Sequence, residues 1–295
     1  AGRRDWIRES AVRDLSNLVF LLLIPSLLFR TMSSVRFEQL DLRPIAAYFP
    51  AALLLLCGSI AWRGFNRGSV VRALAGTFSN MVMIGITLVG LAYGQAGLVT
   101  LLTLVSVHAL ILLTLGSVVL ELAVAREARA GGQRAPHVLE TAWSAFKGAL
   151  IHPIPLPILC GLLYAQTGWG LPAVVDKPLQ LLGSAFGPIS LVLVGVTLAR
   201  TPLGGHLREA LWIAASKNLA LPVLVAASCW LAGIQGLQFT VMVVAAALPV
   251  GANVFLFAQR YEVDQELTTA SMGLSTILAM GTLSLVMALT GLVQT

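Results

Sequence analysis

Apolar runs long enough to cross a lipid bilayer fill this sequence from end to end. We count nine, at residues 15–32, 45–62, 73–93, 97–124, 149–166, 179–199, 211–231, 237–258 and 267–293. A helix needs about 20 apolar residues to cross a hydrocarbon core about 30 Å thick. Because lipid offers backbone groups no hydrogen-bond partners, such runs have to form helices. The sequence therefore predicts an all-α polytopic membrane protein with nine spans.

The basic residues indicate how these spans are oriented. Only 11% of the residues are charged, and the net charge of +6 comes from short connections, which does not indicate nucleic-acid binding. Nine alternating spans place all but four of the 19 Lys and Arg residues on one side; the exceptions are Arg30, Arg36, Arg43 and Lys177. The positive-inside rule then predicts a bacterial inner-membrane protein whose residue 1 is cytoplasmic and whose C-terminus is periplasmic.

The stretch AAALPVGANVFLFAQRY, at residues 245–261, interrupts one of these runs. Pro249 and Gly251 lie near the middle of the span at residues 237–258, and Asn253 follows them. Proline cannot donate a backbone hydrogen bond and clashes with the preceding turn, so we expect the helix to break from Pro249 to Gly251. Non-helical backbone at this depth is tolerated where it lines a cavity, and this makes the break a candidate site.

Three features of the first half recur in the same order in the second half. They are Pro25 with Pro188, Pro50 with Pro222, and Ser106 with Ser275. We expect residues 1–124 to hold four helices of a first repeat, residues 125–148 a cytoplasmic loop with an interfacial helix, and residues 149–295 a second repeat of five helices. The fifth helix of the first repeat would precede Leu15. Because five is odd, the two repeats would be inverted, a plan in which secondary transporters bind substrate at broken helices.

In this repeat, the break expected at residues 249–251 corresponds to the run at residues 73–93. If the two interrupted helices cross, their loose N–H groups and the partial positive charge of half-helix N-termini suit an anion. Asparagine side chains add amide donors and acceptors at the same place. We therefore expect a carboxylate to be held there without a fixed Lys or Arg. The expected substrate-binding residues are Ser79, Asn80, Gly85, Pro249, Val250, Gly251 and Asn253.

Several of these residues also have a purely structural interpretation. Pro and Gly often only kink membrane helices, and side chains such as Asn80 or Ser275 can join neighbouring helices by hydrogen bonds. His108, in the middle of its span, is either a neutral core histidine or a proton-coupling site. Lys217 and Glu121 are expected to snorkel from the cytoplasmic ends of their spans.

Five stretches together resemble one family of transporters. They are LSNLVFLLLIPSLLF, HPIPLPILCGLL, LGSAFGPISLVLVGVTLA, AAALPVGANVFLFAQRY and ASMGLSTILAMGTLSL. From about Leu15 onward, the chain is similar to the auxin efflux carrier (AEC) family, whose bacterial members are relatives of the plant PIN auxin exporters.

The resemblance implies a ten-helix fold of two inverted five-helix repeats, with substrate bound where the fourth and ninth family helices cross. It also implies a scaffold of the first, second, sixth and seventh helices, a moving transport domain of the other six, and small carboxylate substrates such as malonate or malate. The crossover motifs of the family match Leu248, Pro249 and Asn80. Thr87 stands where the family usually has a proline, so the first break is expected to be less unwound.

We therefore expect an elevator-type secondary carrier of a small organic anion, with that carboxylate and the lipid bilayer as its partners. A homodimer is left open, and no nucleic acid, metal or cofactor is expected. Two alternatives stay open, a sodium symporter like the bile-acid carriers and a ligand-binding channel or sensor. An enzyme is not expected, because the sequence has no intramembrane aspartate pair, no His-Glu-x-x-His and no serine-elbow motif.

Overall fold

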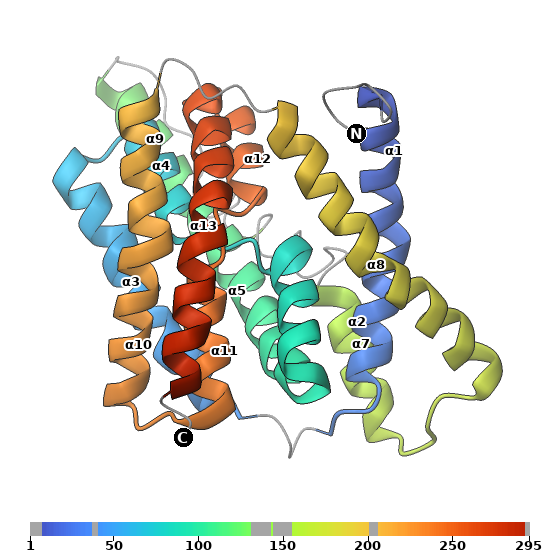
Figure 1. The fold of residues 1–295 in the computed structure, drawn as a ribbon. Helices are drawn as coiled ribbons and strands as arrows, with labels where there is room; N and C mark the ends of the chain where they lie inside the picture. The colour runs from blue at the N-terminus through green and yellow to red at the C-terminus, as the bar shows by residue number, and fades with distance from the viewer. Residues whose placement is uncertain (1–7, 37–40, 131–142, 144–154, 201–205, 293–295) are drawn as a thin grey trace. The chain divides into compact units, whose positions relative to one another are not determined.

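A computed structural model describes residues 8–36, 41–130, 143, 155–200 and 206–292 of the chain (Figure 1). Within these ranges the regular structure is helical, and β-type pairing is confined to one isolated bridge. Five of the described helical segments are long and apolar enough to cross a membrane: Ser10–Met32, Arg43–Arg63, Met81–Ala130, Leu207–Leu231 and Gln265–Thr290. An all-helical polytopic membrane protein is thus confirmed, whereas the inverted repeat and the number of spans stay predictions.

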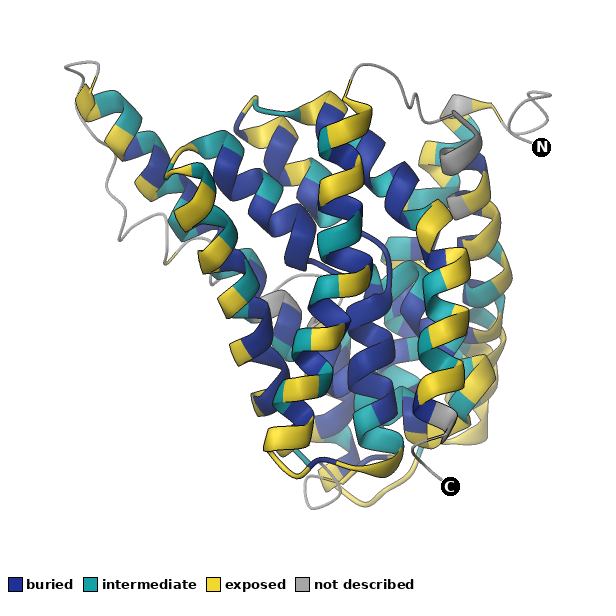
Figure 2. Cartoon of the chain, turned by 60° about the vertical axis from the view of Figure 1, so that its left-hand side comes forward, coloured by how far each residue is buried: buried dark blue, intermediate teal, exposed yellow. Residues whose placement is uncertain are grey.

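The outward faces of the helices are apolar, as contact with lipid requires. Leu91 is 82% exposed, Trp230 75% and Leu54 63%. Figure 2 shows buried residues gathered where helices face one another and exposed residues along their outer faces. Apolar exposure on this scale marks a membrane or protein contact, which agrees with the apolar runs of the sequence.

The helices form two compact units, and each unit takes segments from both halves of the chain. The first unit comprises residues 1–42, 81–109 and 150–201, and the second comprises 43–80, 110–149 and 202–295. These units are groups of packed segments and differ from the repeats expected at residues 1–124 and 149–295. The repeats are a relation between two parts of the sequence, and that relation stays a prediction. The interfacial helix expected within residues 125–148 falls largely outside the described residues.

The first unit is built around a helix that runs through a widened turn. Its parts are α1 (Glu9–Leu18), η2 (Val19–Leu23), α2 (Ile24–Met32), η4 (Met81–Gly85), the first part of α5 (Ile86–Ala130), α7 (Pro155–Gln166) and α8 (Ala173–Arg200). α2 packs against α7 and α8, and Arg30 Nε on α2 pairs with Asp176 Oδ1 on α8 at 2.7 Å. Gly94, with φ +61°, kinks α5 between the runs expected at residues 73–93 and 97–124.

The second unit contains both expected interruptions. It comprises α3 (Arg43–Arg63), α4 (Arg67–Thr77), the end of α5, α9 (Leu207–Ala215), η5 (Ser216–Ala220), α10 (Leu221–Leu231), α11 (Gly236–Ala247), α12 (Asn253–Arg260) and α13 (Gln265–Leu292). In Figure 1, α9 and α10 follow each other as one long helix beside α13. α11 and α12 are the two halves of the run at residues 237–258, so the helix break expected there is observed.

The widened turn η5 has a cause in the sequence. Pro222 lies just beyond it and has no N–H to donate to the carbonyl of Asn218, one turn earlier. The helix therefore opens into a π-type turn, a feature that is frequent at functional sites. This turn brings Lys217 and Asn218 into the interior, where both are fully buried.

Candidate functional site: two helix breaks that pair

The two interruptions meet inside the second unit. α4 ends at Thr77 and α11 at Ala247, and the segments that follow form one antiparallel bridge between Ser79 and Val250. Asn80 donates its N–H to the carbonyl oxygen of Pro249 at 2.8 Å, and Gly251 donates its N–H to that of Phe78 at 2.8 Å. Each break therefore supplies hydrogen-bond partners to the other, which lipid could not do.

Gly251 allows the close approach of the two segments. A Cβ at this position would lie 2.9 Å from Phe78 Cδ1 and 3.1 Å from the carbonyl oxygen of Ser79. The two segments are packed in the interior, where Ser79 is 3% exposed and Val250 1%. The side chain of Val250 belongs to the apolar core together with Phe78, so any part Val250 takes in binding has to come from its backbone.

Side chains from other helices hold the bridge in place. Ser275 Oγ on α13 accepts the N–H of Val250 at 3.0 Å. Asn218 donates from Nδ2 to the carbonyl oxygen of Ser275 at 2.9 Å, and the hydroxyl of Tyr48 on α3 lies 3.4 Å from Ser79 Oγ. Ser275 therefore joins helices, as the structural interpretation of its sequence position anticipated, while Tyr48 and Asn218 were not expected at the site.

Lys217 corrects one expectation from the sequence. It does not snorkel, because it is fully buried and its Nζ donates to the carbonyl oxygens of Ala246 and Leu248 at 2.5 and 2.6 Å. It is buried because α9 begins at Leu207, four residues before the expected span. Lys217 thus lies about 15 Å along the helix, too far in to reach the start of that helix. The expectation that a carboxylate is held without a fixed Lys or Arg stays a prediction.

The start of α12 provides donors that the bridge does not use. In the described part of the chain, neither the N–H groups of Ala252 and Asn253 nor the side-chain amide of Asn253 has a hydrogen-bond partner. Both residues are only partly buried. Two adjacent free N–H groups at a helix N-terminus, with an amide beside them, are suited to an anion such as a carboxylate.

The remaining expected site residues are placed as follows. Asn80 joins the bridge through its backbone and is partly buried. Gly85 ends η4 in the first unit, and His108 is a buried residue of α5 in that unit. The structure thus brings together Ser79, Asn80, Pro249, Val250 and Gly251, with Asn253 following on α12. It leaves the roles of Gly85 and His108 as predictions.

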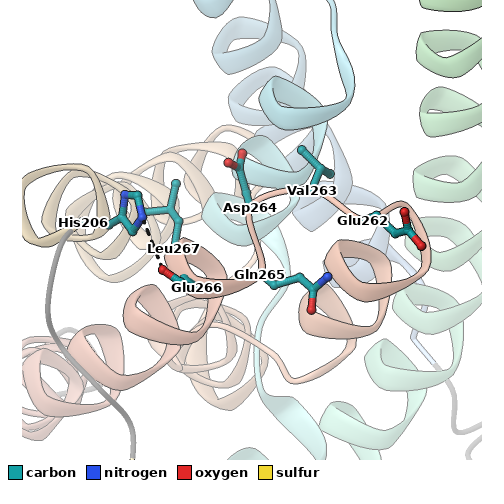
Figure 3. Close-up of a pocket in the computed structure, with 7 residues that line it drawn as sticks. All are labelled: His206, Glu262, Val263, Asp264, Gln265, Glu266 and Leu267. Atoms are coloured by element: carbon teal, nitrogen blue, oxygen red, sulfur yellow. Dashed lines mark ion pairs between the residues drawn. The ribbon is translucent and has the colours of Figure 1, made fainter.

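A pocket of about 460 Å³ opens at the other end of α12. Figure 3 shows its lining, which comprises His206 and the residues from Glu262 to Leu267, in the turn after α12 and at the start of α13. His206 Nε2 lies 3.8 Å from Glu266 Oε2, and Asp264 pairs with Arg72 at 2.8 Å. α12 has eight residues and spans about 12 Å, so this acidic pocket is separate from the bridge and its carboxylates would repel an anion.

Comparisons with known proteins agree with a membrane transporter. A family described as "Membrane transport protein" matches residues 1–287. The chain is 26% identical over 277 residues to a "Putative malonate transporter" of Rhizobium meliloti (strain 1021), covering 92% of this chain and 84% of that protein. It is 25% identical over 168 residues to "Auxin efflux carrier component 8" of Arabidopsis thaliana, covering 55% of this chain and 44% of that protein.

Proposed function

Because the chain belongs to the membrane transport protein family, the family of the auxin efflux carriers, we propose that it carries a small mono- or dicarboxylate across a bacterial inner membrane. The chain is a transporter and not an enzyme, and the proposal concerns its substrate and mechanism. The relative named as a malonate transporter supports a substrate of that class. Residue 1 is proposed to be cytoplasmic and the C-terminus periplasmic, from the distribution of Lys and Arg.

The observation that carries the substrate class is the set of free donors that begins α12. The N–H groups of Asn80, Val250 and Gly251 are used within the bridge or by Ser275. The N–H groups of Ala252 and Asn253 remain for a ligand, with the Asn253 amide beside them. Lys217 Nζ donates to the carbonyl oxygen of Leu248, four residues before Ala252. A carboxylate would accept charge-assisted hydrogen bonds from these amides.

The transport movement is assigned to the second unit. Both helix breaks lie in it, and they are tied together by backbone hydrogen bonds. A substrate held there would have to travel with this unit as a whole, which is an elevator-type alternation in which the first unit serves as scaffold. α5 belongs to both units, in agreement with a connection between a fixed and a moving part.

The membrane potential drives the proposed transport. Among the buried residues of the described ranges there is no Asp or Glu that could exchange protons, and the buried titratable groups of the spans include His108 and Lys217. A potential of 100 mV is worth about 2.3 kcal/mol for each charge moved. His108 stays the alternative coupling residue, and in that case His108→Gln would abolish the pH dependence of transport.

Counterflow of labelled malonate in proteoliposomes tests the proposal. We expect saturable uptake that is accelerated by unlabelled malonate or malate on the opposite side. Asn253→Ala should lower the kcat/KM of transport about tenfold or more, because a hydrogen bond to a charged group contributes about 1.5–3 kcal/mol. The matched control is Asn17→Ala, on an exposed part of α1, which should transport like the wild type.

Each result of this experiment has a definite meaning. Without counterflow for any mono- or dicarboxylate, the substrate class is wrong. Continuous ionic currents without counterflow would favour the channel interpretation. Equal kcat/KM values for Asn253→Ala and the wild type would remove the start of α12 from the binding site while leaving transport itself intact.

A further inference from the structure

Lys217 makes its hydrogen bonds to backbone carbonyls of another helix. It lies in η5 between α9 and α10, it is fully buried, and its ammonium group donates to the carbonyl oxygens of Ala246 and Leu248 at 2.5 and 2.6 Å. No carboxylate pairs with it among the described residues. The partners of this charge are therefore the backbone dipoles at the end of α11.

These two carbonyls have lost their helical donors because of the break. In a continuous helix, Ala246 would accept from the N–H of Val250 and Leu248 from that of Ala252. The N–H of Val250 instead donates to Ser275 Oγ, and that of Ala252 lies beyond the turn. The end of a helix also carries partial negative charge. A cation with several donors is the group that satisfies both needs at once.

The lysine is held at this position from its own helix. Its neighbour Asn218 is fully buried and donates to the carbonyl oxygen of Ser275 on α13 at 2.9 Å. Ser275 in turn holds Val250 of the bridge. η5, α13 and the end of α11 are thus connected. The ammonium group can leave the carbonyls only if the hydrogen bond of Asn218 breaks or if the Lys217 side chain changes rotamer in a packed interior.

In carriers with discontinuous helices, carbonyls at half-helix C-terminal ends are the usual ligands of a coupling sodium ion. Here an ammonium group on the chain itself occupies that position. We propose that Lys217 is a tethered cation which replaces a bound alkali-metal ion at the end of α11, so that the paired breaks assemble without sodium. The inference concerns the assembly of the bridge and holds whichever anion is carried.

The thermal stability of the purified full-length chain tests this inference without any substrate. Tm is measured at constant ionic strength in NaCl, methylammonium chloride and N-methyl-D-glucamine chloride. The wild type should unfold at the same Tm in all three salts. Lys217→Ala should unfold at a lower Tm in N-methyl-D-glucamine and regain several degrees in sodium or methylammonium, which are small enough to enter the space left by the side chain. Lys177→Ala, which removes an exposed lysine of α8, should behave like the wild type.

Two outcomes would overturn the inference. One is a wild-type Tm that rises specifically in sodium, and the other is a Lys217→Ala variant whose Tm does not depend on the cation. If Lys217→Ala cannot be purified, Lys217→Arg and Lys217→Met decide the question by the yield of monodisperse protein. Arginine keeps the charge and should give the higher yield, whereas an equal or higher yield for methionine would show that the charge is not needed.

Discussion

Gly251 donates its N–H to the carbonyl oxygen of Phe78 at 2.8 Å, and the same contact leaves no space for a side chain at position 251. An added Cβ would lie 2.9 Å from the Phe78 ring. We therefore expect Gly251→Ala to lower the free energy of unfolding by about 1–3 kcal/mol, the usual cost of overpacking a buried site. The measurement is the Tm of the purified protein in detergent.

Gly281→Ala is the matched control for this prediction. Gly281 lies in α13, and no atom is within 4 Å of the place where its Cβ would be. Alanine is a better helix former than glycine by about 1 kcal/mol, so this variant should equal or exceed the wild type in Tm. Equal Tm values for the two variants would show that the breaks do not approach as closely as described.

Ser275 provides a second test of the bridge. Its hydroxyl accepts the N–H of Val250 at 3.0 Å, in a place where both residues are buried. Ser275→Ala would leave that N–H without an acceptor, and we expect a loss of about 1–3 kcal/mol of unfolding free energy. Ser284→Ala, an exposed serine of the same helix that bonds only its own backbone, should change the stability by less than about 0.5 kcal/mol. A Ser275→Ala variant as stable as Ser284→Ala would contradict the hydrogen bond.

The break between α11 and α12 could be predicted from sequence because its cause is local. Pro249 lacks a backbone donor and Gly251 tolerates close contact, and both interrupt an apolar run. The partner break at Ser79 and Asn80 carries no proline, and only the comparison between the two halves of the chain pointed to it. That the two segments pair as an antiparallel bridge could not be predicted, because it depends on how α4 and α11 pack within the unit.

Lys217 shows where the prediction failed. Hydropathy places the start of a span at the first strongly apolar residues, and it put the span of Lys217 at Leu211, four residues after α9 begins. That small difference was enough to turn a buried residue into an apparently interfacial one. A sequence signal was present, since an ionisable residue within a membrane span is a functional candidate by default. Its location five residues before Pro222 marked the turn that buries it.

Tyr261 predicts a difference in alkaline stability. Burial raises the pKa of the Tyr261 hydroxyl above its ordinary value, and the hydrogen bond that it donates to Glu121 at 2.9 Å raises that pKa further. Above about pH 10 the unfolded chain loses the tyrosine proton while the folded chain keeps it. The free energy of unfolding therefore falls as the pH rises from there toward the folded-state pKa.

The test of this prediction is Tyr261→Phe, measured as Tm between pH 7 and pH 11. At pH 7 the variant should be less stable by about 1 kcal/mol, because the bond to Glu121 is lost. Phenylalanine does not titrate, so the Tm of the wild type should decline more steeply above pH 10 and approach that of the variant. Two curves that stay parallel over the whole range would show that the hydroxyl keeps the same pKa in both states.

Glu262 is held in a backbone conformation that glycine adopts at lower cost. It is exposed in the turn between α12 and α13, with φ +51°. The left-handed region costs a residue with a Cβ about 1–2 kcal/mol. Glycine removes this strain, but it also makes the unfolded chain more flexible, which offsets part of the gain in stability. Glu262→Gly should therefore raise the unfolding free energy by about 0.5–1 kcal/mol and Tm by about 2 °C.

Asp264→Gly relieves a similar φ of +52° but removes the ion pair with Arg72 at 2.8 Å, so its Tm should be below that of Glu262→Gly. The reverse order would mean that the ion pair contributes less to this turn than the backbone conformation does.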